Sequence, residues 1–178
     1  MANLILVGPM GAGKTTIGRR LATALQWAFC DSDREIERRT GVSIPLIFEL
    51  EGEAGFRARE KTVLEELCRR QSTVIATGGG AVLDAANRRC LKASGRVIYL
   101  RVSVDEQLRR LARDNQRPLL QTDDPRRRLE TLAAQREPLY REIADWVVTT
   151  DDQGATHVVQ QLLKLVAREV DSQLGNPP

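Results

Sequence analysis

The chain has 178 residues, a length that suits one domain with a sizeable hydrophobic core. Hydrophobic residues make up 42% and charged residues 29% of it, as in soluble globular proteins. The net charge of +3 is mild and aromatic residues are only 4%, so a base-stacking surface, and hence nucleic acid as a partner, is not expected.

Other counts exclude further classes. No apolar segment approaches the roughly 20 residues that a membrane-spanning helix needs, and the start of the chain has no basic region typical of a signal peptide. The three cysteines are widely spaced, as in a reducing compartment. We therefore expect a cytoplasmic protein without a membrane partner. His157 is the only histidine, which excludes a multi-histidine metal site.

The first predicted strand leads directly into a glycine-rich loop. Leu4–Val7 is a short apolar run, and Thr16–Leu25 repeats apolar residues at helical spacing. Between them, residues 8–15 read Gly-x-x-x-x-Gly-Lys-Thr, the phosphate-loop pattern in its strand–loop–helix context. Glycine lets the backbone curl so that its N–H groups surround phosphate oxygens. The pattern predicts ATP binding, with Lys14 on the outer phosphates and the Thr15 hydroxyl on Mg²⁺.

Apolar, β-prone runs alternate with helical patterns along the rest of the chain. The further predicted strands are Trp27–Cys30, Val74–Thr77, Val97–Leu100 and Trp146–Thr149, and the last predicted helix is Thr156–Val170. Such alternation predicts a three-layer α/β/α domain with a central, five-stranded parallel sheet. That sheet needs no second chain, so a monomer is expected. Ligands of such folds lie beyond the carboxyl ends of the strands.

The second predicted strand is the one that ends in carboxylates. Asp31 and Asp33 are two residues apart, so in extended backbone they would point the same way. Asp31 could then reach the metal shell, while Asp33 could orient an acceptor hydroxyl and take its proton. Either aspartate could instead only cap a helix that starts near Arg34. The third and fourth predicted strands end without a carboxylate, which argues against a motor or switch ATPase.

Two polar intervals are not typical of packed crossovers. The first, Asp33–Glu60, has a mixed helical pattern and contains "GFRARE", with Arg57 and Arg59. The second, Arg113–Arg128, is arginine-rich and contains prolines, which is typical of a lid or of a disordered segment. Arginine forks bind carboxylates and phosphates, but position alone does not say which arginines do so here.

Six motifs in this order and spacing, "GPMGAGKTT", "DSD", "GFRARE", "TGGG", "RPLL" and "PLY", closely resemble those of the shikimate kinase family. The resemblance extends over nearly the whole chain, to about residue 150. It implies an enzyme that phosphorylates the 3-hydroxyl of shikimate with ATP and Mg²⁺, on the route to chorismate and the aromatic amino acids.

The resemblance also implies roles for individual residues. The phosphates of ATP would be held by Gly11, Ala12, Gly13, Lys14, Thr15 and Thr16, and Mg²⁺ by Thr15 and Asp31. Shikimate would be bound by Asp33, Arg57, Gly79, Gly80 and Arg136, with Asp33 as the general-base candidate. Arg110 and Gln153 would contact adenine, Gln153 standing where the family often has proline. The substrate-binding segment would cover about residues 33–60, and a lid at about residues 112–126 would bring Arg117 over the phosphates.

Two other functions remain open from the residues. A gluconate or nucleoside monophosphate kinase would share the strand order, the lid and the arginines. A non-catalytic ATP-binding module would keep the fold, although the presence of Lys14, Asp33 and Arg117 argues against it.

Overall fold

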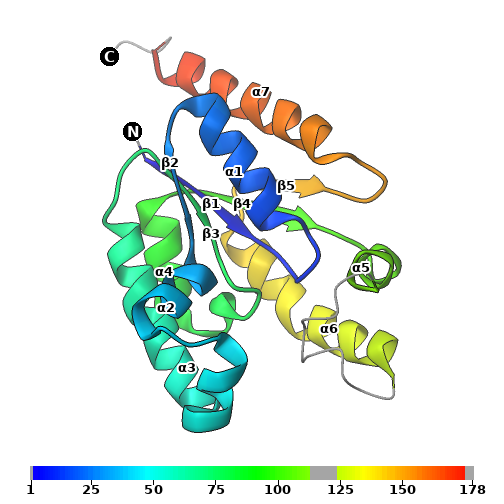
Figure 1. The fold of residues 1–178 in the computed structure, drawn as a ribbon. Coiled ribbons are helices and arrows are strands. Elements are labelled where there is room, and N and C mark those ends of the chain that lie inside the picture. The colour runs from blue at the N-terminus through cyan, green and yellow to red at the C-terminus, as the bar shows by residue number, and fades with distance from the viewer. Residues whose placement is uncertain (1, 113–123, 175–178) are drawn as a thin grey trace.

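The computed structural model describes residues 2–112 and 124–174 and contains a five-stranded parallel sheet (Figure 1). The strands are β1 (Asn3–Val7), β2 (Ala28–Asp31), β3 (Thr73–Ala76), β4 (Gly95–Arg101) and β5 (Trp146–Thr149). Their order in the sheet is β2-β3-β1-β4-β5, and every neighbouring pair is parallel. The predicted fold class is confirmed. Strand β5 has the predicted bounds, and the other strands differ from prediction by one or two residues at their ends.

Helices cover both faces of the sheet (Figure 1). They are α1 (Lys14–Leu25), α2 (Ser32–Thr40), α3 (Ile44–Cys68), the 3₁₀ helix η1 (Ala81–Leu83), α4 (Ala85–Ser94), α5 (Val104–Leu111), α6 (Pro125–Ile143) and α7 (Ala155–Leu174). None of the helices within the described ranges is both long enough and apolar enough to cross a membrane.

The alternation of side chains along β1 divides the core into its two halves. Leu4 and Leu6 pack with Ile17 and Leu21 of α1 and with the apolar face of α7. Ile5 and Val7 point to the other face and pack with side chains of α3, α4 and α6. Because β1 is buried on both sides, its apolar run is continuous. This central position fixes the loop that follows β1 at the middle of the sheet's carboxyl edge.

The predicted insertion at residues 33–60 is helical throughout most of its length. It comprises nearly all of α2 and the first two thirds of α3, with a turn at Gly41, whose φ is 72°. Helix α3 is broken at Gly52, where φ is 68° and ψ is −176°, so its two parts run in different directions. Across the break, Phe48 of the first part stacks on Phe56 of the second.

The predicted lid falls mainly outside the described residues. Helix α5 ends at Leu111 with Ala112 as its cap, and residues 113–123 are not described. The chain resumes at Asp124, whose carboxylate accepts a hydrogen bond from the Arg127 N–H and caps α6. Residues 125–128, part of the interval expected to be a loop, form the first turn of α6.

Candidate active site

A cavity of about 690 Å³ opens at the carboxyl edge of the sheet. The glycine-rich loop and α1 form one end of it, and α2, α3, the loop after β3 and α6 form the other. Most of the predicted site residues line it: Gly11, Gly13, Lys14, Thr15, Thr16, Asp31, Asp33, Arg57, Gly79, Gly80 and Arg136. Side chains separated by more than 120 positions in the sequence therefore meet in one space.

The loop between β1 and α1 has the backbone geometry of a phosphate loop. Gly8, Gly11 and Gly13 have φ values of 147°, 76° and 87°, which side-chain-bearing residues rarely adopt. At Gly8 a Cβ would also lie 2.5 Å from the carbonyl oxygen of Leu100 in β4. Gly13 precedes the first residue of α1, so the loop's N–H groups and the positive end of the helix dipole face the same place.

The two polar side chains at the start of α1 are already held in position. The Lys14 ammonium donates hydrogen bonds to the carbonyl oxygens of Gly8, at 2.7 Å, and Pro9, at 2.8 Å. The Thr15 hydroxyl donates to the Asp31 carboxylate across the cavity floor, at 2.7 Å. Hydroxyl and carboxylate oxygens are ligands that Mg²⁺ prefers. Thr15 and Asp31 thus offer two oxygen ligands that fit Mg²⁺. Among the described residues no group of three or more His, Cys, Asp or Glu side chains could hold a metal ion.

The backbone around the two aspartates differs from the prediction. Extended backbone ends at Asp31, and α2 begins at Ser32, so Asp33 lies in the first helical turn. The other Asp31 oxygen accepts hydrogen bonds from the N–H groups of Asp33, at 3.1 Å, and Arg34, at 3.3 Å. Asp31 therefore caps the helix and also contacts Thr15. Asp33 does not cap it, and its side chain lines the cavity.

The Asp33 carboxyl group is buried against Gly78, where a Cβ would lie 2.6 Å from Oδ1. That oxygen has no hydrogen-bond partner among the described residues. Burial, and next the negative charges of Asp31 and Glu60, raise the pKa of Asp33 to about 7, against a smaller lowering by Lys14 and Arg57. A carboxylate with such a pKa can accept a proton near neutral pH, as general-base catalysis requires.

Arg57 is held at the opposite wall by Glu60, a residue to which sequence reasoning gave no role. The guanidinium donates to the Glu60 carboxylate at 2.6 Å and lies so close to Gly80 that a Cβ there would be 2.2 Å from Nη2. Glu60 is fully buried, and burial raises its pKa despite the neighbouring Arg57. The motif "GFRARE" alone does not indicate this role, because only the fold shows that the Glu60 side chain faces inward. Arg59 instead pairs with Glu51 at the surface.

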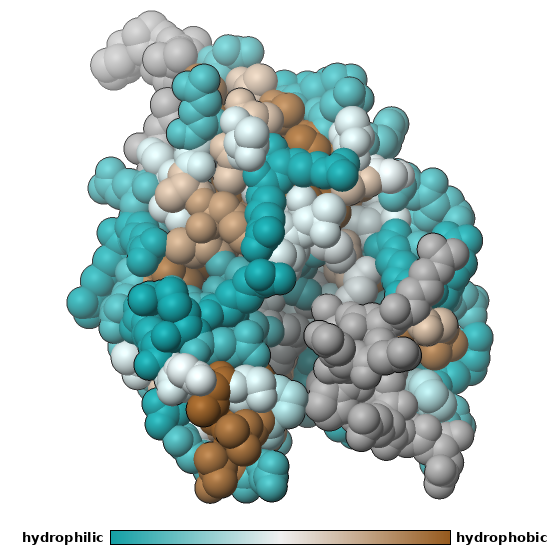
Figure 2. All heavy atoms as spheres, viewed as in Figure 1, coloured by the Kyte–Doolittle hydropathy of each residue, from teal (hydrophilic) through white to brown (hydrophobic). Residues whose placement is uncertain are grey.

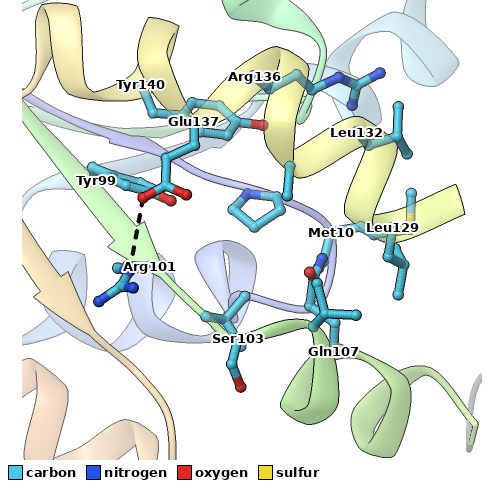
Figure 3. Close-up of a pocket in the computed structure, with 14 residues that line it drawn as sticks. Met10, Tyr99, Arg101, Ser103, Gln107, Leu129, Leu132, Arg136, Glu137 and Tyr140 are labelled. Atoms are coloured by element: carbon cyan, nitrogen blue, oxygen red, sulfur yellow. Dashed lines mark hydrogen bonds and ion pairs between the residues drawn. The ribbon is translucent and has the colours of Figure 1, made fainter. Parts of the chain in front are cut away.

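Arg136 reaches the cavity from α6. Its Nη1 lies 3.5 Å from the position of a Cβ on Gly79, and its buried Nε has no hydrogen-bond partner among the described residues. Arg136 also borders a smaller cavity of about 210 Å³ between β4, α5 and α6 (Figure 3). Arg57 and Arg136 thus flank the Gly79–Gly80 segment, and two guanidinium groups around one space suit a carboxylate ligand.

Three predicted residues that the structure describes, Ala12, Arg110 and Gln153, do not line the main cavity. Ala12 is a fully buried residue of the loop itself. Arg110 donates to the carbonyl oxygens of Gly11, at 2.8 Å, and Thr150, at 2.6 Å, and so ties α5 to the phosphate loop. Gln153 lies in the turn after β5, and its buried side-chain oxygen has no hydrogen-bond partner among the described residues. Arg117 lies outside the described residues.

One wall of the cavity is apolar, which the sequence did not indicate. Ile44, Pro45, Phe48 and Phe56 line it. The rings of Phe48 and Phe56 are stacked, with centroids 4.7 Å apart, on opposite sides of the break at Gly52. Phe48 and Leu50 are exposed, and Figure 2 shows an apolar patch over this first part of α3. A ligand here would meet charges on one side and rings on the other.

Comparison with known proteins agrees with this arrangement. A family model described as shikimate kinase matches residues 10–167. A shikimate kinase of Thioalkalivibrio sulfidiphilus is 61% identical over 161 residues (90% of this chain, 85% of the relative), and one of Pseudomonas aeruginosa is 59% identical over 164 residues (92% and 95%). The structure of a shikimate kinase from Acinetobacter baumannii, solved in complex with shikimate, is similar with a TM-score of 0.91 and 51% identity, covering 95% of this chain and 94% of that one. The chain belongs to the shikimate kinase family.

Proposed function

We propose that this protein transfers the γ-phosphoryl group of ATP to the 3-hydroxyl of shikimate, giving shikimate 3-phosphate and ADP. One observation carries the proposal: a single cavity has a phosphate loop at one end and Asp33, Arg57 and Arg136 at the other. Membership of the shikimate kinase family supports the same reaction. The gluconate and nucleoside monophosphate kinase alternatives have no such support.

In the acceptor half, the two arginines bind the carboxylate of shikimate and Asp33 binds its hydroxyls. Arg57 is oriented by Glu60, and Arg136 lies beside Gly79, so both cations border the acceptor half before the substrate arrives. As the 3-hydroxyl oxygen forms its bond to the γ-phosphorus, Asp33 accepts the hydroxyl proton. The bond between the γ-phosphorus and the bridging oxygen breaks, and ADP leaves.

In the nucleotide half, the N–H groups of the loop from Gly11 to Thr16 surround the phosphates, and Lys14 lies against the outer ones. Thr15 and Asp31 would hold Mg²⁺, which when bound neutralises charge on the phosphates. Arg110 contributes by fixing the loop through the Gly11 carbonyl. Closure of Arg117 over the phosphates, the adenine contacts of Arg110 and Gln153, a monomeric state and a cytoplasmic location stay predictions.

A coupled ADP-release assay with Mg²⁺ and ATP tests the proposal by comparing shikimate, gluconate, AMP and no acceptor. Stimulation by shikimate alone is expected. Equal slow ADP release in all four reactions would mean that the phosphate loop hydrolyses ATP and that the acceptor site has been misassigned. Stimulation by gluconate or AMP instead would identify a different kinase.

A further inference from the structure

Tyr140 is a buried side chain beside the substrate half of the cavity to which no role has yet been given. It is 1% exposed and lies on α6, one helical turn beyond Arg136. Its hydroxyl donates a hydrogen bond to the carbonyl oxygen of Gly79, 61 residues earlier in the chain, at 2.5 Å. This bond directly links α6 to the loop after β3.

Two features make the Tyr140 hydroxyl a fixed donor. Its ring stacks on that of Tyr99 in β4, with centroids 5.1 Å apart and an interplanar angle of 26° (Figure 3). Burial raises the pKa of Tyr140 above its usual value, against a smaller lowering by the neighbouring Arg136, so the hydroxyl stays protonated at neutral pH. A buried hydroxyl without a partner costs free energy, and Gly79 is the acceptor that removes this cost.

The bond matters because the Gly79 carbonyl and the Gly80 N–H belong to the same peptide unit. No peptide bond in the described chain is cis, so these two groups point in opposite directions from one plane. Holding the carbonyl toward Tyr140 therefore aims the Gly80 N–H away from α6. Both glycines line the cavity, and Arg57 and Arg136 lie against them.

We propose that Tyr140 is a positioning residue for shikimate: its hydroxyl fixes the orientation of the Gly79–Gly80 peptide, and with it the N–H that faces the substrate between the two arginines. This inference rests on the proposed function. Tyr140 itself does not reach the reacting atoms, and it acts through the backbone of Gly79 and Gly80.

The test compares Tyr140→Phe with Tyr99→Phe and the wild type. Both variants lose one hydroxyl from the same aromatic stack, but only Tyr140→Phe loses the bond to Gly79. In Tyr140→Phe the KM and the Kd for shikimate should rise up to about tenfold, because binding must then order the released Gly79–Gly80 peptide. The KM for ATP should stay within about twofold, and Tyr99→Phe should match the wild type for both substrates.

A second readout does not depend on activity. In NMR spectra of the unliganded protein, the Gly80 amide signal should shift in Tyr140→Phe and keep its position in Tyr99→Phe, with thermal melting showing that both variants are folded. Unchanged shikimate affinity, an equal loss for ATP, an equal effect of Tyr99→Phe or an unmoved Gly80 signal would each overturn the inference. A wild type without shikimate-stimulated turnover would instead refute the proposed function, and the Gly80 signal would still decide the role of Tyr140.

Discussion

The buried Asp33 carboxyl group has opposite consequences for catalysis and for folding. As the proton acceptor it is needed for turnover, but it is not part of the phosphate loop. We expect Asp33→Asn to lower kcat by at least about 10²-fold, the usual contribution of a general base. The Kd for ATP should change little. Steady-state kinetics and nucleotide titration measure the two effects, and near-normal turnover would remove Asp33 from the reaction.

The same substitution should stabilise the protein when metal and ligands are absent. The pKa of Asp33 is raised to about 7 in the fold, by burial and by Asp31 and Glu60 and despite Lys14 and Arg57. The contribution of Asp33 to folding stability is therefore fully present below pH 3.8, which is its pKa in the unfolded chain. It is lost as the pH rises toward 7. We expect the free energy of unfolding of Asp33→Asn, relative to that of the wild type, to increase over this pH range by at most about 4 kcal/mol. Chemical denaturation in EDTA measures this difference.

Asp84 provides a control, because the fold lowers its pKa instead of raising it. It is an exposed helix cap, and the N–H groups of Asn87 and Ala86 lower its pKa. Its carboxylate stabilises the fold at neutral pH, and this contribution is lost only as the pH falls through the lowered pKa. Asp84→Asn should therefore bring no gain in stability between pH 4 and 7. A gain equal to that of Asp33→Asn would point to a general effect of removing negative charge.

Residues with local signals could be predicted from the sequence, and those that depend on the fold could not. Lys14, Thr15 and Asp31 follow from a spacing pattern at the end of a strand, and the structure brings them together. Glu60 and Tyr140 have no such pattern, because their partners Arg57 and Gly79 are recognised only by burial and direction. The raised pKa of Asp33 was equally hidden, since it arises from tertiary neighbours.

Among the secondary-structure elements, α3 depends on a single break. Gly52 has a φ of 68°, and no described atom beyond its own stretch of backbone lies within 4 Å of where its Cβ would be, so Gly52→Ala meets backbone strain but no clash. Relief of the strain would straighten α3 and separate Phe48 from Phe56 across the break. We expect Gly52→Ala to lower stability by about 1 kcal/mol and to raise the KM for shikimate several-fold, because the apolar wall is displaced.

Gly41→Ala is the matched control for this effect. Gly41 also has a positive φ, of 72°, and open space around it, but it ends α2 and does not line the cavity. It should cost similar stability in thermal melting and leave the KM for shikimate unchanged. Equal kinetic effects of the two variants would show that loss of stability, and not the break in α3, weakens binding.

The sheet could be predicted because each strand is a short apolar run between polar segments. The interval 33–60 was harder, since the break at Gly52 and the turn at Gly41 interrupt the helical period and left only a mixed pattern. Helix propensity also could not show that α2 begins at Ser32, directly after the strand. The helix begins there because Asp31 caps it.

For the molecule as a whole, one cavity joins two ligand halves built on the same sheet. Each ligand alone should therefore stabilise the folded protein, raising Tm by roughly 5–10 °C at about 100 times its Kd. Lys14→Ala should abolish the shift caused by ADP, and Arg136→Ala the shift caused by shikimate. Differential scanning fluorimetry measures all four combinations.

In this experiment each variant is the control for the other. Loss of both shifts in either variant would mean that the two halves do not bind their ligands separately. Loss of the ADP shift in Arg136→Ala would assign that arginine to the nucleotide half.

The hydrogen bonds from the Lys14 ammonium to the carbonyl oxygens of Gly8 and Pro9 lower the entropic cost of nucleotide binding. Fixing a rotating lysine costs about 1.5–2 kcal/mol of conformational entropy, and here that ordering has taken place during folding. An arriving phosphate oxygen exchanges one set of acceptors for another around an ammonium that is already in place. The Lys14 side chain then loses little rotational freedom when the nucleotide binds, and the exchange of acceptors releases only modest heat. The loop is therefore preorganised for its anion.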